Sequence, residues 1–418
     1  MRKRKIWLLT VGFCLLAIGC GKDHDNGDDT PPLPFERTVL VYMSAENNLS
    51  GENIIKKEME ELRVGSRNIG HNALVVYVDD SSPKPPYIIR LQDGVTKDSL
   101  SFGKDTLSSS PQTIKYVLDY TSDHYPALEY GLVLWGHASG WVMEDSVGLS
   151  RSQYRAFGMD NGRNSTSPYL SGKWINIPTL SKVLSDWDHK LRFILGDCCL
   201  FQCIECAYEL RHTADFIIGS AAEIPGKGAP YDTMTKSMFN TTDTFYQAIA
   251  DSYFAQVIPI SYTDSDWRYH EYNSRTPLSV VKTSELPQLA VATNAVLHSF
   301  LSKESNMIPS VAGLIYYGKA QKIDMYDMND IMLHNADSTA YSKWKEAFDR
   351  AVVYKKNAKN GWMTNGMVPY DNFKNLTDER YGGISMFVPQ TIPYQTPYQE
   401  YITHLSWYYA AGLYELGW

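Results

Sequence analysis

Short apolar runs alternate with amphipathic segments through the first two thirds of the chain. Five of these runs are rich in β-branched and aromatic residues and have the length of buried strands. They are residues 37–44, 73–78, 131–135, 192–196 and 216–220. Apolar residues recur at helical spacing over 47–64 and over 111–120, where Ser110 is a candidate N-cap residue. Strands that alternate with helices predict a mostly parallel sheet covered on both faces, which is an α/β fold.

Beyond about residue 265 the pattern changes to longer helical segments. Helices are predicted over 285–302 and 341–358, with a late strand over 383–389. We therefore expect two parts: a first domain over 37–264, and a C-terminal helical or mixed region over 265–418 that packs on it.

The N-terminus has the pattern of an export signal. Four basic residues, from Arg2 to Lys5, precede an apolar stretch over 6–18 that is too short to span a bilayer comfortably. The motif Ala17-Ile18-Gly19-Cys20 resembles a bacterial lipobox. We predict a signal peptide over 1–19, a lipid on Cys20 and a flexible acidic tether over 20–36. This implies anchoring to the outer membrane of a Gram-negative bacterium, on either face; ordinary cleavage that releases a secreted protein is the alternative.

Charge limits the range of partners. Removing the four basic residues of the leader from 39 leaves 35 against 47 acidic residues, a balance of −12. No Lys/Arg cluster remains outside the leader, so we expect no nucleic-acid partner. We expect a monomer that attracts basic ligands at long range.

Four of the six cysteines are clustered over residues 198–206. A disulfide framework would instead spread cysteines along the chain to close long loops. The spacing of Cys199, Cys203 and Cys206 also occurs in iron–sulfur motifs, but an exported chain argues against such a cluster. We assign no metal ligand, and we expect Cys203 and Cys206 to be small buried core residues. The sequence also allows a disulfide between Cys198 and Cys199, which would inactivate a nucleophile at 199.

Two predicted strands are followed by residues capable of nucleophilic chemistry. His137 follows the run at 131–135, and Cys199 follows the run at 192–196. The carboxyl ends of parallel strands share one edge of a sheet, and ligands bind there. The thiol and the imidazole are therefore expected to meet, which indicates a Cys/His hydrolase.

This chemistry sets requirements on the surroundings of the pair. The thiolate is the nucleophile, so its pKa must fall, and we expect a helix that starts at Cys199 to contribute through its dipole. Backbone N–H groups of Cys199 and of the turn at 137–140 would hold the oxyanion. His137 would protonate the leaving amine and then activate water.

Four stretches together resemble the clostripain family of cysteine peptidases, peptidase family C11. They are residues 39–49, 125–141, 196–210 and 224–232. The resemblance implies a caspase-like α/β/α sandwich with a helical C-terminal extension. It also implies that His137 and Cys199 are the catalytic pair, and that the protein is an endopeptidase acting on proteins or peptides after Arg or Lys.

The same resemblance suggests further roles. Asp197, in the motif Asp-x-Cys, would form the floor of a pocket for a cationic side chain, with Glu223 and Asp232 as candidates for its wall. The alternative is that Asp197 organises the strand end by accepting backbone N–H bonds. The backbone of Ala138 would help to hold the oxyanion, although the family usually has glycine there. A catalytically impaired surface protein that binds peptides or glycans is therefore the alternative function.

Residues 138–173 show little periodicity, and loops of this length inside a domain are usually functional or sites of processing. Family members resemble zymogens that cut themselves in such a loop. Arg151, Arg155 and Arg163 are therefore candidates for self-cleavage, and ordinary solvated arginines are the alternative. The sequence requires no cofactor. The resemblance allows calcium, for which the sequence provides no recognisable loop.

Overall fold

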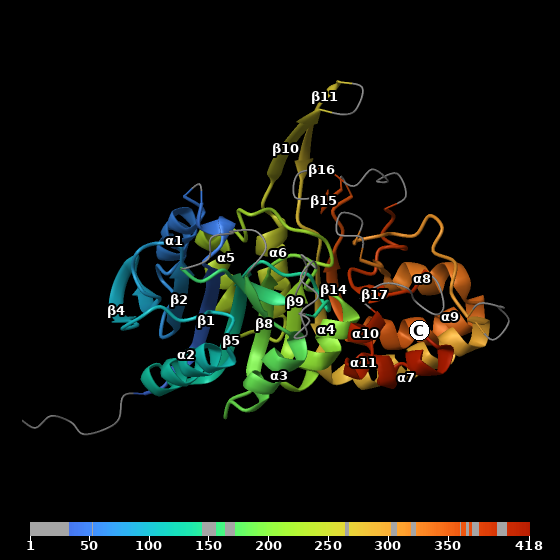
Figure 1. Cartoon of the computed structure of the whole chain (residues 1–418), viewed down its shortest axis with the longest axis horizontal. Coiled ribbons are helices and arrows are strands. Elements are labelled where there is room, and N and C mark those ends of the chain that lie inside the picture. The colour runs from blue at the N-terminus through green and yellow to red at the C-terminus, as the bar shows by residue number, and fades with distance from the viewer. Residues whose placement is uncertain are drawn as a thin grey trace, which may run out of the picture. The chain divides into compact units, whose positions relative to one another are not determined.

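A nine-stranded sheet crosses the computed structural model (Figure 1). Its five central strands are parallel and are neighbours in the order β9-β8-β5-β1-β2. Their bounds are β1 Phe35–Ala45, β2 Ala73–Asp80, β5 Ala127–Gly136, β8 Leu191–Asp197 and β9 Ala214–Gly219. Each of these strands coincides with one of the five apolar runs, apart from Ser220 at the end of the last run, so the predicted α/β class is confirmed.

The structure describes much of the chain, and all of the described residues except Leu33 belong to the unit Pro34–Trp418. The described ranges are 33–51, 53–143, 156–163, 172–263, 267–301, 307–318, 323–359, 361–364, 368–369, 376–390 and 399–418. Cys20, the signal peptide and most of the tether lie outside them. The last two tether residues, Phe35 and Glu36, belong to β1 and not to a linker.

Antiparallel strands extend the sheet at both edges. On the side of β2 these are β3, Tyr87–Gln92, and β4, Val95–Ser101. On the side of β9 they are β12, Leu278–Lys282, and β14, Val352–Lys356. Because β12 and β14 come from beyond residue 264, the expected division between 264 and 265 does not coincide with an edge of the sheet.

Helices cover both faces of the sheet, because the central strands bury their side chains in both directions. One face packs against α1, Ile54–Gly65, α5, Tyr231–Met238, and α6, Phe245–Phe254. The other packs against α2, Pro111–His124, α3, Ile177–Ser185, and α4, Ile204–Glu209. Ser110 precedes α2 as predicted, although its side chain makes no capping hydrogen bond.

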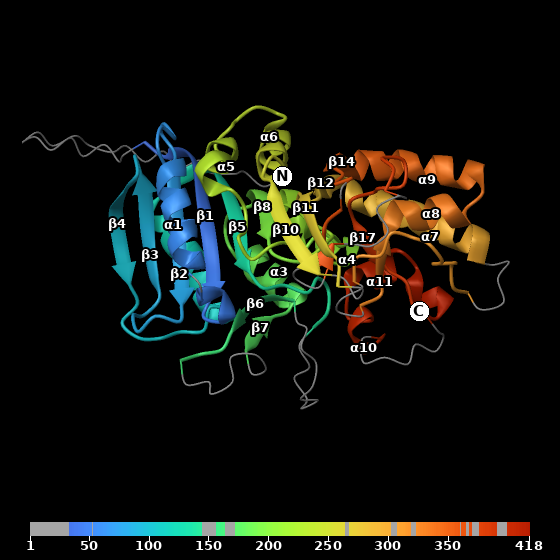
Figure 2. The same ribbon diagram turned by 90° about the horizontal axis from the view of Figure 1, so that it is seen from above.

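The C-terminal region adds a group of helices beyond β14 (Figure 2). They are α7 Leu286–Leu301, α8 Met328–Asn335, α9 Ser338–Ala351, α10 Gln399–Ile402 and α11 Ser406–Ala410. The helix predicted over 341–358 ends at Ala351, because Val352 begins β14 and pairs with β12. The late strand, predicted over 383–389, is β17, Ser385–Phe387, which pairs with β13, Met325–Asp327.

Smaller elements complete the described chain. The segment predicted as helix over 47–64 divides into a 3-10 turn, η1, Asn48–Ser50, and α1. The irregular stretch at 138–173 contains one short strand, β6, and its last residue, Lys173, begins the strand that pairs with β6. The remaining strands are β6 Phe157–Asp160, β7 Lys173–Ile175, β10 Ile258–Thr263, β11 Tyr269–Ser274, β15 Met363–Thr364 and β16 Val368–Pro369. The remaining 3-10 turns are η2 Leu210–His212, η3 Thr283–Glu285 and η5 Leu413–Leu416. No helix within the described ranges has both the length and the apolar character needed to cross a membrane.

Candidate active site

His137 and Cys199 leave two neighbouring parallel strands at the same edge of the sheet. In the register of β5 and β8, Trp135 is the partner of Asp197. Each of the two candidate residues stands two positions after this pair. Since neighbouring strands lie about 5 Å apart, the structure brings the two chain segments together at the carboxyl edge, as the sequence predicts.

The imidazole of His137 is held by Asn48, which lies in the 3-10 turn η1 shortly after β1. Its Nε2 lies 2.8 Å from Oδ1 of Asn48, in η1. With the amide oxygen as acceptor, Nε2–H donates, and Nδ1 keeps a lone pair that can accept a proton. Trp174 lies beside the ring, with centroids 6.3 Å apart. Burial lowers the pKa of His137 to about 4, so the imidazole is neutral at pH 7.

Asn48 is absent from the candidates chosen from the sequence. Its signal there is weak, because a polar pair after a strand is common in any loop. Only the strand order places this pair, Asn47 and Asn48, beside the turn that carries His137.

The sulfur of Cys199 is half-buried under the backbone of Ile224. The N–H of Ile224 lies 3.4 Å from Sγ, and Sγ lies 3.7 Å from the carbonyl oxygen of the same residue. Burial and then the Glu223 charge raise the pKa of the Cys199 thiol to about 12, although the Ile224 N–H acts in the opposite direction. In this form Cys199 is therefore a neutral thiol and His137 a neutral imidazole.

The expectation that a helix starts at Cys199 is wrong. The helix α4 begins at Ile204, after Cys203 as its N-cap residue. Cys199 lies in a turn in which Leu200 has a positive φ of 57°. A dipole acts within about one turn of a helix end, so α4 does not lower the pKa of Cys199.

Backbone hydrogen bonds join the turn after His137 to β6 and to Ala156, the residue before it. The N–H of Ser139 donates to Ala156 O at 3.2 Å, and the N–H of Gly158 donates to His137 O at 2.9 Å. These two bonds flank Ala138, which is paired with Phe157 in an antiparallel bridge. Ala138 is thus at a non-hydrogen-bonded position, where its own N–H points away from β6. Its φ is not positive, so alanine fits here without the freedom of glycine.

Asp197 has its carboxylate inside the core, where it is 2% exposed. Its Oδ2 accepts from the N–H of Ala229 at 3.0 Å and the hydroxyl of Tyr231 at 2.7 Å, and its Oδ1 accepts from Tyr253 at 2.6 Å. Burial raises the pKa of this carboxyl despite these donors. In this form Asp197 organises the strand end, which is the structural role left open above.

The two candidates for the pocket wall occupy different environments. Glu223 is 7% exposed and lies close enough to Cys199 to affect the pKa of the thiol. Asp232 is exposed in the first turn of α5. The structure therefore brings Glu223, and not Asp232, next to the sulfur.

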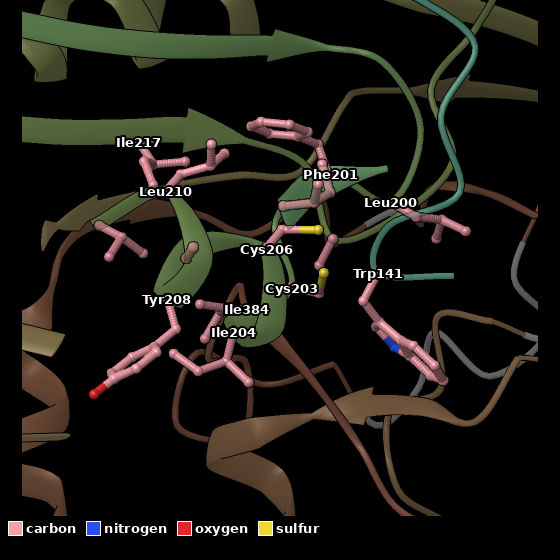
Figure 3. Close-up of a cluster of buried hydrophobic side chains, with 14 of the residues drawn as sticks. Trp141, Leu200, Phe201, Cys203, Ile204, Cys206, Tyr208, Leu210, Ile217 and Ile384 are labelled. Atoms are coloured by element: carbon pink, nitrogen blue, oxygen red, sulfur yellow. The ribbon is translucent and has the colours of Figure 1, made fainter. Parts of the chain in front are cut away.

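The other cysteines are core residues. Figure 3 shows Cys203 and Cys206 among apolar side chains of α4 and the sheet. They are 0% and 1% exposed, which confirms their predicted role as buried core residues. All four cysteines over 198–206 are free thiols, so Cys198 and Cys199 form no disulfide in this structure.

Only one of the three self-cleavage candidates lies in the described residues. Arg163 follows β6, and its Nε lies 3.7 Å from Oε1 of Glu46 and 3.3 Å from Oδ1 of Asp105. Its guanidinium also donates to Pro83 O at 3.0 Å. Arg151 and Arg155 lie outside the described ranges.

One group of acidic residues near this edge is able to hold a metal ion, although the sequence predicts no metal ligand. Oxygens of Glu46, Asp79 and Asp160 all lie within 4.8 Å of one another, and all three residues are buried. Each is individually unremarkable in the sequence, and only the fold places them together: β1 and β2 are neighbours in the main sheet, and β6 packs against β1.

Comparison with known proteins agrees with this architecture. The profile of the clostripain family matches residues 41–416. The chain belongs to the clostripain family. Clostripain from Hathewaya histolytica is 22% identical over 223 residues, which cover 47% of this chain and 40% of that protein. The chain thus spans about two fifths of this relative's length.

Two solved clostripain-family structures cover nearly the whole unit. A secreted C11 cysteine protease from Bacteroides thetaiotaomicron, in complex with an irreversible peptide inhibitor, is 27% identical with a TM-score of 0.71. An inactive zymogen C11 protease from Parabacteroides distasonis is 24% identical with a TM-score of 0.65, and shows the fold alone. Each match covers 91% of this chain and 99% of the other. The predicted caspase-like sandwich is the fold of this family.

Proposed function

We propose that this chain is an exported cysteine endopeptidase in which Cys199 is the nucleophile and His137 the general acid and base. The observation that carries the proposal is the register of β5 and β8, because it places the segments with His137 and Cys199 at one edge of the sheet. Family membership and the peptide inhibitor bound to the B. thetaiotaomicron protease support peptides as substrates. The description of that protease as secreted supports export.

The proposed reaction proceeds through a thioester. His137 takes the proton of Cys199, and Sγ forms a bond to the carbonyl carbon of the scissile peptide. The oxyanion is held by the N–H groups of Ala138 and Cys199. Collapse breaks the C–N bond, and the imidazolium returns its proton to the leaving amine. Water then loses a proton to His137, attacks the thioester and releases the acid and the thiol.

The neutral resting pair fits a mechanism in which substrate drives activation. A thiol with a pKa of about 12 gives almost no thiolate at pH 7. Substrate would displace the backbone of Ile224 and so expose Sγ of Cys199. The thiol proton would pass to His137 as Sγ attacks the peptide carbonyl carbon. Asn48 would hold the imidazole in one tautomer throughout.

We also propose cleavage after Arg or Lys. The acidic balance of the mature chain and the carboxylates of Asp197 and Glu223 near Cys199 support this preference. Asp197 would have to exchange a tyrosine donor for the cationic side chain, in a bidentate pair in the case of Arg. Asp232 would act from the outer wall. Self-cleavage at Arg151, Arg155 or Arg163 and anchoring through a lipid on Cys20 complete the proposal.

Fluorogenic peptides with Arg, Lys or Asp before the scissile bond test this function. The purified protein should cleave the basic peptides, and the Cys199→Ala variant should lose at least about 1,000-fold in kcat/KM. An arginyl ketone that reacts with thiols should label Cys199 alone. Absence of both turnover and labelling would favour the binding protein that has lost activity.

A further inference from the structure

Three buried carboxylates converge beside the candidate active site. Glu46 directly follows β1, Asp79 is the partner of Ser44 near the end of β2, and Asp160 ends β6. They are 3%, 0% and 0% exposed. Oxygens from all three lie within 4.8 Å of one another. Like charges this close and this deep repel strongly unless something neutralises them.

The three side chains differ in how far the protein satisfies them. Asp160 accepts from the N–H and the hydroxyl of Ser108 at 2.5 and 2.8 Å, and from the N–H of Gly162 at 2.8 Å. Among the described residues, no donor reaches either oxygen of Asp79 or Oε2 of Glu46. A fully buried carboxylate without a donor is rare and calls for a missing partner.

Among the described residues, the guanidinium of Arg163 is shared between the cluster and a further carboxylate. Its Nε stands 3.7 Å from Oε1 of Glu46 and 3.3 Å from Oδ1 of Asp105. The cluster must therefore hold extra protons or a bound cation.

We propose that Glu46, Asp79 and Asp160 bind one divalent cation, and that this ion is calcium. All donors in the cluster are oxygens, which favours a hard cation over zinc or copper. Calcium accepts six to eight oxygen ligands in flexible geometry. The hydroxyl of Tyr77, on the same face of β2 as Asp79, also makes no hydrogen bond to another described residue and can complete the set with water.

The proposed ion joins the segments that hold the catalytic imidazole. Glu46 is two residues before Asn48, the partner of His137. The N–H of Asn161 donates to Glu46 O at 2.9 Å, and Asn47 donates to Met159 O at 2.7 Å. The strand β6 is also hydrogen-bonded to the turn at His137. An ion that joins β6 to the ends of β1 and β2 would therefore hold both that turn and Asn48 in place around the imidazole.

Binding is best measured on the full chain carrying Cys199→Ala, because this variant separates metal binding from peptidase activity. After treatment with a chelator, calorimetric titration with CaCl₂ should show one site per chain, and the melting temperature should rise with calcium concentration. Terbium should show luminescence sensitised by Tyr42 and Tyr77, whose rings are stacked at 4.5 Å.

Two variants and a neighbouring control test whether these carboxylates form the calcium site. Asp79→Asn and, independently, Glu46→Gln should each weaken calcium binding at least about 100-fold. Asp80→Asn, at the adjacent position of β2, should bind as tightly as the parent. Absence of binding to the parent, or unchanged binding in both variants, overturns the site. Protons would then neutralise the cluster, and both variants would be at least as stable as the parent at any calcium level.

Discussion

Residue identity predicts the chemistry of Cys199 and His137, but their surroundings determine their protonation. Both side chains are neutral in the resting form, because burial acts on a thiol and an imidazole in opposite directions. A helix start at Cys199 would favour a thiolate, but α4 begins at Ile204 and does not supply one.

The pH dependence of alkylation tests the state of Cys199. With a pKa raised to about 12, the thiolate fraction at pH 7 is small and increases through pH 9 and beyond. The rate at which iodoacetamide modifies Cys199 in the absence of substrate should therefore still rise above pH 9, as measured by peptide mass spectrometry. The buried residues Cys203 and Cys206 serve as internal controls. A rate that levels off near pH 8 would contradict the raised pKa.

Asn48 is expected to act as a positioning residue. Asn48→Ala removes the acceptor of Nε2–H, so the imidazole loses its preferred tautomer and orientation. We expect kcat to fall about 10-fold or more with little change in KM. Ser50→Ala, in the same 3-10 turn, is the matched control and should leave kcat within about 2-fold. A fall confined to KM would assign Asn48 to substrate binding instead.

At the scale of elements, the connection between β9 and α5 contacts the side chains of both Asp197 and Cys199 in the Asp-x-Cys motif. Ile224 contacts the sulfur of Cys199, and Ala229 donates to Asp197. Gly228 lies between these contacts with a φ of +67°. A Cβ at this position would stand 2.9 Å from Nε1 of Trp135 and 3.0 Å from Oδ2 of Asp197.

Gly228→Ala is therefore expected to destabilise the protein by about 1–3 kcal/mol, through backbone strain and crowding of buried polar atoms. Chemical denaturation measures this change. Gly226→Ala is the matched control, because its Cβ would make only ordinary contacts with Leu49 and Ile54 at 3.8 and 3.9 Å. Equal losses in the two variants would show that the connection has no special geometry at Gly228.

At the scale of the whole molecule, the C-terminal region is part of the central sheet. The strand β12 pairs with β9, and β14 pairs with β12. Glu205 of α4 accepts the N–H of Phe387 in β17 at 2.8 Å. The segment that follows Cys199 thus depends on a residue 182 positions after Glu205.

A chain that stops at residue 264 should therefore fail to fold. Loss of the buried side chains Leu278, Val280 and Val281 alone removes roughly 5–9 kcal/mol, comparable to the net stability of a typical domain. Circular dichroism during heating should show no cooperative transition, whereas the full chain with Cys199→Ala should melt in one. A native-like spectrum and a cooperative melt of the shortened chain would establish a separate first domain.

The sequence by itself determined the central strands, the α/β class and the placement of His137 and Cys199 after neighbouring strands at one edge of the sheet. These follow from local periodicity and from the rule that parallel strands share a carboxyl edge. The start of α4, the end of α9 at Ala351 and the strand β6 escaped prediction, because turn geometry and long-range pairing decide them.

Only the tertiary structure decided the environment of each side chain. Asn48 reaches His137, and Glu46 reaches Asp79, because strand order brings distant chain segments to one edge, where β6 adds Asp160. The same packing encloses Asp197 with Tyr231 and Tyr253. Burial, proximity of charges and hydrogen-bond partners are properties of three-dimensional neighbours, so no local pattern in the chain encodes them.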